Sequence, residues 1–131
     1  MKKKEVELKS NKRILMVDND AGFLKILGLM LSDYGCICAT DGEAAVKLYL
    51  KFRPALVLLE VVLPKMNGIE ATRKILEVDP DAKIIGLTSL RDRSKDILEA
   101  GAIDVVEKPF RRRELLEIVE RYLSDKPRFK S

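Results

Sequence analysis

Apolar runs alternate with amphipathic stretches five times along this chain, and that alternation limits the fold more than any other feature. The short apolar runs predict buried strands at 13–17, 35–39, 55–60, 83–87 and 104–107. The amphipathic stretches predict helices near 21–34, 42–52, 68–78, 92–100 and 111–124. Repeated strand–helix units of this kind predict a parallel sheet covered by helices on both faces.

Helix start and stop residues agree with this division of the chain. Asp20 and Asp41 can cap the beginnings of helices, and elements end near Gly35, Pro80 and Gly101. Crossovers between parallel strands are right-handed, which leaves few topologies for five short strands. The prediction is an α/β fold, a flavodoxin-like (βα)5 doubly wound parallel sheet in the order 2-1-3-4-5, with its crevice between the first and third strands.

The length of 131 residues suits one domain, because a chain of that size buries roughly two-thirds of its surface on folding. We place the domain at residues 13–124, between a basic N-terminal extension at 1–12 and a short C-terminal tail at 125–131. The net charge of +4 comes from the ends, since residues 14–125 hold 16 basic and 19 acidic side chains. The body of the domain is therefore expected to be mildly acidic, with solvated basic ends.

Two residue types narrow the chemistry. The chain has no histidine, which excludes histidine acid/base catalysis and a phosphohistidine relay residue. Cys36 and Cys38 lie two apart on a predicted strand, where they suit a disulfide poorly, and we expect reduced thiols in the core. The sequence has neither a recognisable secretory signal nor a membrane-spanning apolar run, so we expect a cytoplasmic protein without membrane contact.

Polar side chains follow four of the five predicted strands. Glu60 ends the third strand, and the others are Asp18 and Asn19 after the first, Thr88 and Ser89 after the fourth, and Lys108 after the fifth. Because the carboxyl ends of parallel strands lie on one side of the sheet, these groups are expected to meet there. Carboxylates can hold a divalent cation, while a lysine and a hydroxyl neutralise phosphoryl oxygens. The pattern predicts a site for a phosphoryl group together with a cation.

With these residues in place, the chain resembles the receiver domain of two-component response regulators over roughly residues 12 to 124. The resemblance is carried by Ile14-Leu15-Met16-Val17-Asp18, Leu56-Val57-Leu58-Leu59, Leu63-Pro64-Lys65-Met66-Asn67-Gly68, Leu87-Thr88-Ser89, Gly101-Ala102 and Lys108-Pro109-Phe110. Each motif alone is weak, but their combination is specific. The resemblance implies a phosphorelay signalling domain and not an enzyme.

The resemblance also implies a role for each residue at the predicted edge. Glu60 stands at the phosphoacceptor position, where the family has an aspartate that takes phosphate from a histidine kinase. The Mg²⁺ positions are held by Asp18, Asn19 and the backbone carbonyl of Val62. Thr88 would contact the phosphoryl group, Lys108 would pair with it, and the Lys108–Pro109 bond would be cis.

Three departures from the family pattern weaken three different steps. Glu60 is longer than aspartate by one methylene, and positioning errors on the order of 1 Å can cost about a hundredfold in rate. Asn19 replaces a metal-binding acid, so the Mg²⁺ site is expected to be weakened or absent. At the switch positions Thr88 is kept, but Val105 replaces an aromatic residue that swings inward on activation. We therefore predict a degenerate receiver, a pseudo-receiver that acts by protein–protein interaction.

The resemblance places partner binding on the face made by the fourth helix, the fifth strand and the fifth helix. That face would include Arg91, Arg93, Lys95, Glu99, Asp104 and Arg111. Its mixed charges suit a signalling protein or a second copy of the chain, and a histidine kinase is one candidate. We expect a monomer or weak homodimer, and no direct DNA binding, because no output module follows Ser124.

Plainer interpretations stay open for single residues. Thr88 could cap a helix, and Asn19 could begin a turn. Glu60 could be only a salt-bridge partner of Lys108, which would also be the resting form of a degenerate receiver. These alternatives differ in whether the residues touch one another.

A different class of protein also fits the start of the chain. The apolar run 14–17 followed by Asp18 and Asp20 resembles the beginning of haloacid dehalogenase-type phosphohydrolases, with Asp18 as nucleophile and Asp20 as general acid. Thr88 and Lys108 could fill the later hydroxyl and lysine roles. Against this alternative, the sequence has neither a late acidic pair for Mg²⁺ nor a cap domain, and Glu60 would have no task.

Overall fold

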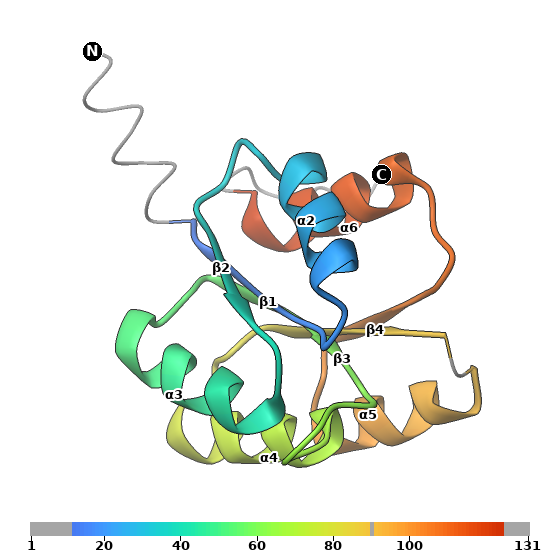
Figure 1. The fold of residues 1–131 in the computed structure, drawn as a ribbon. Coiled ribbons are helices and arrows are strands. Elements are labelled where there is room, and N and C mark those ends of the chain that lie inside the picture. The colour runs from blue at the N-terminus through green and yellow to red at the C-terminus, as the bar shows by residue number, and fades with distance from the viewer. Residues whose placement is uncertain (1–11, 90, 125–131) are drawn as a thin grey trace, which may run out of the picture.

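The computed structural model describes residues 12–89 and 91–124. Its centre is a parallel sheet of β1 (Ile14–Val17), β2 (Cys36–Ala39), β3 (Leu56–Glu60), β4 (Ile84–Thr88) and β5 (Asp104–Glu107). The strands lie in the order β2-β1-β3-β4-β5 (Figure 1), which confirms the predicted flavodoxin-like sheet. The order reverses beside β1 and β3, the place where open α/β sheets bind ligands.

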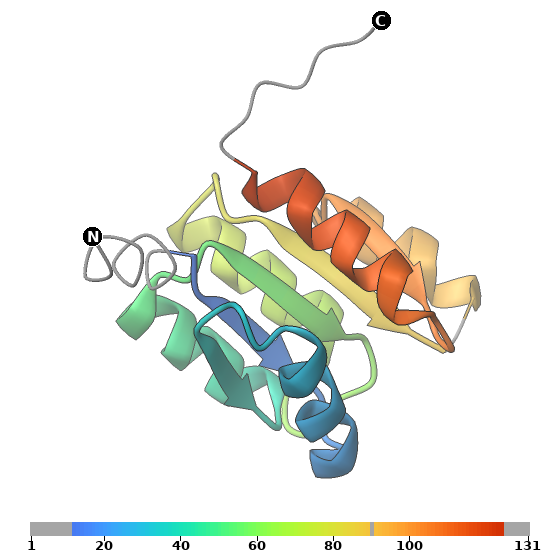
Figure 2. The same ribbon diagram turned by 90° about the horizontal axis from the view of Figure 1, so that it is seen from above.

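Helices cover both faces of this sheet. They are α2 (Ala21–Met30), α3 (Gly42–Phe52), α4 (Gly68–Val78), the 3-10 turn η1 (Arg91–Arg93), α5 (Ser94–Ala100) and α6 (Arg112–Leu123). In Figure 1, α2 and α6 lie above the sheet, whereas α3, α4 and α5 lie below it. Figure 2 looks down on the same arrangement and shows α2 and α6 in front of the strands. The layers are those of a doubly wound fold.

The core forms one cluster on each face of the sheet, because successive side chains of a strand point to opposite faces. Leu15 and Val17 belong to the cluster beneath the sheet, whereas Ile14 and Met16 pack with α2 and α6 above it. The strands β1, β3 and β4 are buried at every position. Burial on both faces explains why their sequences are continuous aliphatic runs.

The edge strand β2 is less buried, and this corrects the prediction for the cysteines. Both are free thiols, but Cys36 is only half-buried and Cys38 is exposed. Of the described strands only β1 pairs with β2, so residues of β2 are less completely covered than those of a central strand. Burial, with a smaller contribution from Cys38, raises the pKa of the Cys36 thiol to about 11.

Helix boundaries follow the predicted signals with two differences. Asp20 and Asp41 cap α2 and α3 through their side chains, as predicted. The first helix ends at Met30 and not near residue 34, because the Ser32-Asp33 pair that follows favours turns over helix. The predicted helix 92–100 is divided between η1 and α5.

The turn after α5 depends on Gly101. Its φ of 119° lies in the left-handed region, and a Cβ at this position would come 2.3 Å from Leu76 Cδ1. A larger residue would therefore be strained and would also collide with α4. This glycine fixes how the chain passes from α5 into β5.

The predicted terminal segments lie beyond the described part of the chain. Of the basic extension at 1–12 only Lys12 is described, and the tail at 125–131 lies wholly outside the described residues. Among the helices that the structure describes, none combines the length and the apolar character needed to cross a membrane.

Candidate functional site at the carboxyl edge of the sheet

The carboxyl ends of four strands meet at one edge of the sheet. Asp18 follows β1, Glu60 ends β3, Thr88 ends β4, and Lys108 follows β5. Asp18, Glu60 and Thr88 are buried, although each is polar. Buried polar groups are costly unless they are paired, so their partners indicate what this edge is built to do.

Lys108 joins the two acidic residues. Its Nζ lies 2.7 Å from Asp18 Oδ2 and 2.9 Å from Glu60 Oε1. The exposed fractions of the side chains are 18% for Lys108, 4% for Asp18 and 10% for Glu60. We call these three residues the charge cluster. One ammonium is thus shared by two carboxylates at the place predicted for a phosphoryl group and a cation.

The remaining carboxylate oxygens are also occupied. Asp18 Oδ1 accepts a hydrogen bond of 2.9 Å from the backbone N–H of Asp20. Glu60 Oε2 accepts one of 2.6 Å from the N–H of Val61 and a longer one of 3.4 Å from that of Val62. Each carboxylate is therefore bound on one oxygen by the ammonium and on the other by the backbone.

The electrostatics of the cluster favour the charged lysine. Burial of the ammonium lowers the pKa of Lys108, but its hydrogen bonds to Asp18 and Glu60 and their negative charges outweigh that effect, so the pKa lies above its usual value. A buried cation with a raised pKa is held by its neighbours more strongly than by water. Lys108 is thus a fixed positive charge within the site.

One aromatic ring of α2 covers the lysine, and a second ring packs against the first. Lys108 Nζ lies 4.0 Å from the centroid of the Phe23 ring, a cation–π contact. Phe110 meets Phe23 edge to face, with centroids 6.1 Å apart. An apolar groove of about 390 Å³ opens beside these rings and is bordered by Ile26 and Met30 of α2. Lys108 therefore adjoins hydrocarbon on this side.

The loop after Glu60 passes very close to other backbone segments. A Cβ on Gly68 would come 2.2 Å from the carbonyl oxygen of Glu60, and one on Gly42 would come 1.9 Å from that of Met66. Asn67 caps α4 by accepting a hydrogen bond of 2.9 Å from the N–H of Glu70. Only glycine allows these approaches, and they hold the loop firmly beside the charge cluster.

The predicted switch positions, Thr88 and Val105, lie on neighbouring strands. Thr88 is fully buried at the end of β4, and its carbonyl oxygen accepts a hydrogen bond of 2.8 Å from the N–H of Lys108. Val105 is half-buried on β5 and packs against the core beneath the sheet. The Lys108–Pro109 bond is cis, as the resemblance implied. The backbone of Thr88 thus adjoins the lysine that pairs with the two acids.

Not every predicted ligand is gathered into the cluster. Asn19 is exposed. Asp20 is exposed as well, and it uses Oδ1 to accept a hydrogen bond of 3.1 Å from Phe23 N–H, which caps α2. Val62, whose carbonyl was a predicted ligand, has an exposed fraction of 55%. Of the predicted Mg²⁺ ligands, only Asp18 touches Lys108.

These residues fit a divalent cation poorly. Within residues 12–89 and 91–124, three or more Asp, Glu, Cys or His side chains do not come together in a geometry suited to a metal. The oxygens of Asp18 and Glu60 that a cation would need already bind Lys108. A Mg²⁺ ion here would have to displace the ammonium from both carboxylates, and Asn19 brings no charge to help it.

The sequence predicted that Glu60 and Lys108 meet, but not every contact that Lys108 makes. The pairing of Lys108 with Glu60 was anticipated, whereas the shorter contact to Asp18 and the ring of Phe23 were not. An aromatic side chain in the first turn after a capping aspartate is a weak signal, because its contacts depend on how the helix is placed. Asn67 was also missed, although an asparagine before glycine at a helix start is a capping signal.

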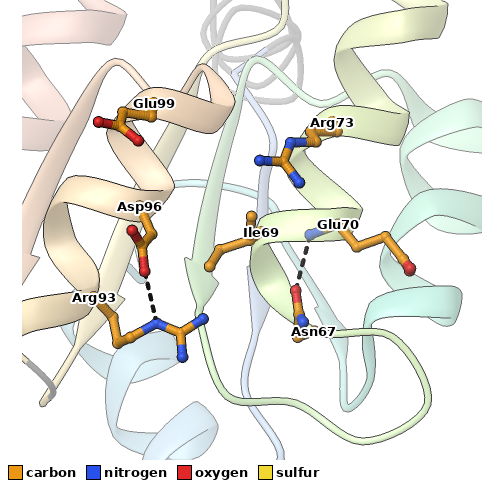
Figure 3. A pocket seen from close by; sticks show the side chains of 7 residues that line it. All are labelled: Asn67, Ile69, Glu70, Arg73, Arg93, Asp96 and Glu99. Atoms are coloured by element: carbon orange, nitrogen blue, oxygen red, sulfur yellow. Dashed lines mark hydrogen bonds and ion pairs between the residues drawn. The ribbon is translucent and has the colours of Figure 1, made fainter.

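A second groove, which none of the charge cluster residues lines, lies between α4 and α5 (Figure 3). It has a volume of about 440 Å³ and is lined by Asn67, Ile69, Glu70, Arg73, Arg93, Asp96 and Glu99. Arg93 Nε lies 3.1 Å from Asp96 Oδ2, as the dashed line in Figure 3 marks. Its two arginines and three acids favour neither an anion nor a cation, so we assign it no ligand.

The fold and the strand-end residues define a class of signalling domain that known sequences also identify. Residues 14–120 match the sequence model of the response regulator receiver domain family. A match over most of the chain, together with the five-stranded sheet in the order 2-1-3-4-5, shows the family. The chain belongs to the response regulator receiver domains of two-component signalling.

Particular relatives are similar over nearly their whole length. Protein CcdB of Bacillus subtilis is 40% identical over 117 residues, which covers 85% of this chain and 97% of that protein. Chemotaxis protein CheY of Thermotoga maritima is 34% identical over 119 residues, with 84% and 96% covered. These matches do not favour the phosphohydrolase alternative with Asp18 as nucleophile.

A solved structure gives the same fold. The receiver domain of sensor histidine kinase PA1611 from Pseudomonas aeruginosa, with a magnesium ion coordinated in its active site cleft, superimposes with a TM-score of 0.82. It is 30% identical, and the match covers 88% of this chain and 100% of that one. The family thus includes members that bind Mg²⁺ in the cleft.

Proposed function

We propose that this chain is a stand-alone receiver domain that no longer cycles phosphate on residue 60 and that signals by binding another protein. The observation that carries the proposal is the charge cluster, in which Lys108 Nζ lies 2.7 Å from Asp18 and 2.9 Å from Glu60. In this proposal Glu60 occupies the phosphoacceptor position, and its salt bridge with Lys108 is the working state of the site.

Phosphoryl transfer to a carboxylate needs a free oxygen aimed at the donor and positive charge around the phosphoryl group. Glu60 has one oxygen on the ammonium and the other on backbone N–H groups. Its longer side chain moves these oxygens relative to where an aspartate would hold them. Both effects oppose in-line attack by Glu60, which supports a receiver that does not take up phosphate.

The cluster also resembles only in part what a phosphorylated receiver would contain. A phosphoryl group carries about −1.5 to −2 charge and three acceptor oxygens, whereas Glu60 carries a single charge. Lys108 pairs with both Glu60 and Asp18, so its single positive charge is shared between two carboxylates. We infer a resting conformation that is held by internal charges, with Thr88 and Val105 at the switch positions and no ring at position 105 to report a change.

Mg²⁺ binding is weakened in this proposal. The ammonium of Lys108 takes the place of the cation between Asp18 and Glu60, and Asn19 supplies a neutral amide where the family has an acid. We expect bound Mg²⁺ only at concentrations well above those that suffice for receivers with two acids at these positions.

Function then depends on contact with a protein in the cytoplasm. The proposed surface is the family's partner face, made here by α5, β5 and α6. Exposed charges on it include Lys95 and Glu99 on α5 and Arg111 before α6; the side chain of Arg91, also predicted there, lies outside the described residues. A histidine kinase remains a candidate partner, and the acidic body of the domain argues against duplex DNA.

Intact mass spectrometry tests the proposal. The full chain is incubated with Mg²⁺ and a small acyl-phosphate donor such as acetyl phosphate, beside the variants Glu60→Asp and Glu60→Gln. We expect no phosphoryl adduct on the natural chain or on Glu60→Gln. Glu60→Asp is the sensitive control, and it should take up phosphate at least in part. A stoichiometric adduct located on residue 60 of the natural chain would overturn the proposal.

A further inference from the structure

The outer edge of β5 borders a groove that none of the charge cluster residues lines. The groove lies between β5 and α6 and has a volume of about 550 Å³. Among the described strands, β5 pairs only with β4, so no strand lies along its other edge; within β5 the N–H of Val105 donates a hydrogen bond of 2.8 Å to Asp104 Oδ1. Unpaired strand edges are templates for pairing with another chain.

The lining indicates that the groove exposes the edge of the strand and not one of its faces. All four residues of β5, from Asp104 to Glu107, contribute to it. Successive side chains of a strand point to opposite faces, so a wall made of every residue in turn must run along the strand's edge. Ile118 of α6 lies at the groove as a buried apolar residue.

The charges around the groove are mainly negative. Four carboxylates line it, from Asp104, Glu107, Glu114 and Glu117, against the single guanidinium of Arg121. Arg121 Nη1 lies 3.5 Å from Asp104 Oδ2, so this cation is already paired within the groove. The side chain of Glu117 is exposed on α6. The groove thus has a net negative charge, and the exposed carboxylate of Glu117 is the group that a cationic partner could reach.

We propose that this groove binds an extended, lysine- or arginine-rich segment of a partner protein, which adds to the free edge of β5 as a further strand. Backbone hydrogen bonds to β5 supply affinity, and alternate side chains of the segment face the carboxylates of α6. The inference rests on the proposed function, because it names the chemistry of the partner that the α5–β5–α6 face would recognise.

Other occupants fit less well. Two copies joined edge to edge through β5 would bring Asp104 and Glu107 against the same acids of the second copy, and like charges across a strand pair are destabilising. Nucleic acid would be repelled by the same carboxylates. An apolar helix would meet a largely charged rim, with Ile118 and the valines of β5 as its apolar contacts.

Nuclear magnetic resonance on the ¹⁵N-labelled full chain tests the proposal. The probe is a synthetic peptide of alternating lysine and valine, and its glutamate counterpart is the control peptide. We expect saturable shifts of the backbone amides at 104–107 and along the groove side of α6 with the lysine peptide alone. No saturable shifts at 104–107, or equal shifts with both peptides, would overturn the proposal.

Two matched variants locate the effect. Glu117→Lys reverses a charge that lines the groove and should lower the affinity for the lysine peptide by about threefold or more. Glu77→Lys reverses an exposed charge on α4, on the other face of the sheet, and should leave the affinity unchanged. Equal weakening by both variants would mean that only net charge matters and would contradict a groove-specific site.

Analytical ultracentrifugation without peptide tests whether a second copy of the chain occupies the groove. The full chain should stay monomeric at concentrations where the peptide binds; a dimer that Glu117→Lys dissociates would mean that a second copy fills the groove. The acyl-phosphate experiment is independent of both results. A phosphoryl adduct on residue 60 would contradict the proposed function whether or not the peptide binds. If the lysine peptide does not bind, only the inference about the partner is contradicted.

Discussion

Two charged regions adjoin β5, and they differ in whether their charges are paired within the chain. At its carboxyl end Lys108 enters the charge cluster, where one ammonium pairs with two carboxylates and the exposed fractions of the three side chains are 4% to 18%. Along its free edge runs the β5–α6 groove, where even the paired side chains of Arg121 and Asp104 are 43% and 30% exposed. One place is closed by the chain itself, and the other is open to a partner.

The comparison teaches where each part of a receiver can keep its function. Removing one member of a buried, paired set leaves uncompensated charge and is costly. Exposed pairs contribute little to folding and are free to exchange partners. A receiver whose cluster is closed from within can lose phosphate chemistry while its outer groove still recognises a protein. The predictions below test this difference, from the largest effect on stability to the smallest.

Replacing Lys108 should have the largest effect. Lys108→Met keeps the hydrocarbon stem but leaves the carboxylates of Asp18 and Glu60 without their shared cation. We expect the free energy of unfolding to fall by about 3 kcal/mol, measured by urea denaturation at neutral pH. A loss below about 0.5 kcal/mol, the range of an ordinary surface change, would mean that the cluster is not closed as described.

Glu60→Gln should cost less, because it leaves no unpaired charge. Lys108 would keep Asp18, and the glutamine carbonyl can still accept from Val61 N–H. The expected loss is about 1 kcal/mol. In a double-mutant cycle with Lys108→Met the two losses should be less than additive, because both residues belong to one set of contacts; strict additivity would speak against their coupling.

Phe23→Leu tests the aromatic cover. Leucine retains most of the apolar contact but removes the ring 4.0 Å from Lys108 Nζ. A cation–π contact of a partly desolvated ammonium is worth roughly 1 kcal/mol, and a loss of that order is expected, together with a lower pKa of Lys108. Phe52→Leu, which alters a half-buried aromatic at the end of α3, serves as the control and should leave that pKa unchanged.

The charge cluster and the half-buried thiol of Cys36 predict that the protein is less stable at alkaline pH. The raised pKa of Lys108 contributes stability that is present below its ordinary value of 10.5 and is lost as the pH rises through the folded value. Cys36, whose pKa is raised from 9.0 to about 11, adds a loss over that interval. Stability measured from pH 8 to pH 11 should therefore decline, and Cys36→Ser should remove part of the decline.

Charge changes in the β5–α6 groove should hardly alter the free energy of unfolding. Glu117→Lys changes an exposed residue of α6, so its effect on the free energy of unfolding should stay within about 0.5 kcal/mol, although peptide binding weakens. Urea denaturation measures the first effect and resonance shifts the second. A large loss of stability would show that the carboxylate of Glu117 is needed by the fold, and the contrast with Lys108 would fail.

Much of the fold followed from sequence pattern, and the reason is visible in the central strands. Aliphatic runs such as 56–59 indicate a strand that is buried on both faces. The strand order follows because crossovers between parallel strands are right-handed. The meeting of Glu60 with Lys108 was predictable because strand ends in a parallel sheet share an edge. Cys38 was misplaced although the predicted order already put the strand 35–39 at an edge, because the lower coverage of an edge strand was not applied to its side chains.

The rest depends on contacts that no local pattern encodes. The ring of Phe23 covers Lys108 because of where α2 is placed on the sheet, and the short contact to Asp18 depends on how the loops after β1 and β5 meet. Asn19 is exposed, whereas its neighbours Asp18 and Asp20 are engaged by Lys108 and by the cap of α2. The β5–α6 groove likewise arises from the placement of α6, which hydrophobic spacing alone does not determine.

The pKa of the Lys108 ammonium is the most direct test of the closed cluster. It can be followed by nuclear magnetic resonance of the lysine side chain during a pH titration of the natural chain and of Glu60→Gln. The structure predicts a pKa above the ordinary 10.5 in the natural chain and a lower one in the variant. A value at or below 10.5 that the variant leaves unchanged would contradict the shared ammonium on which this interpretation rests.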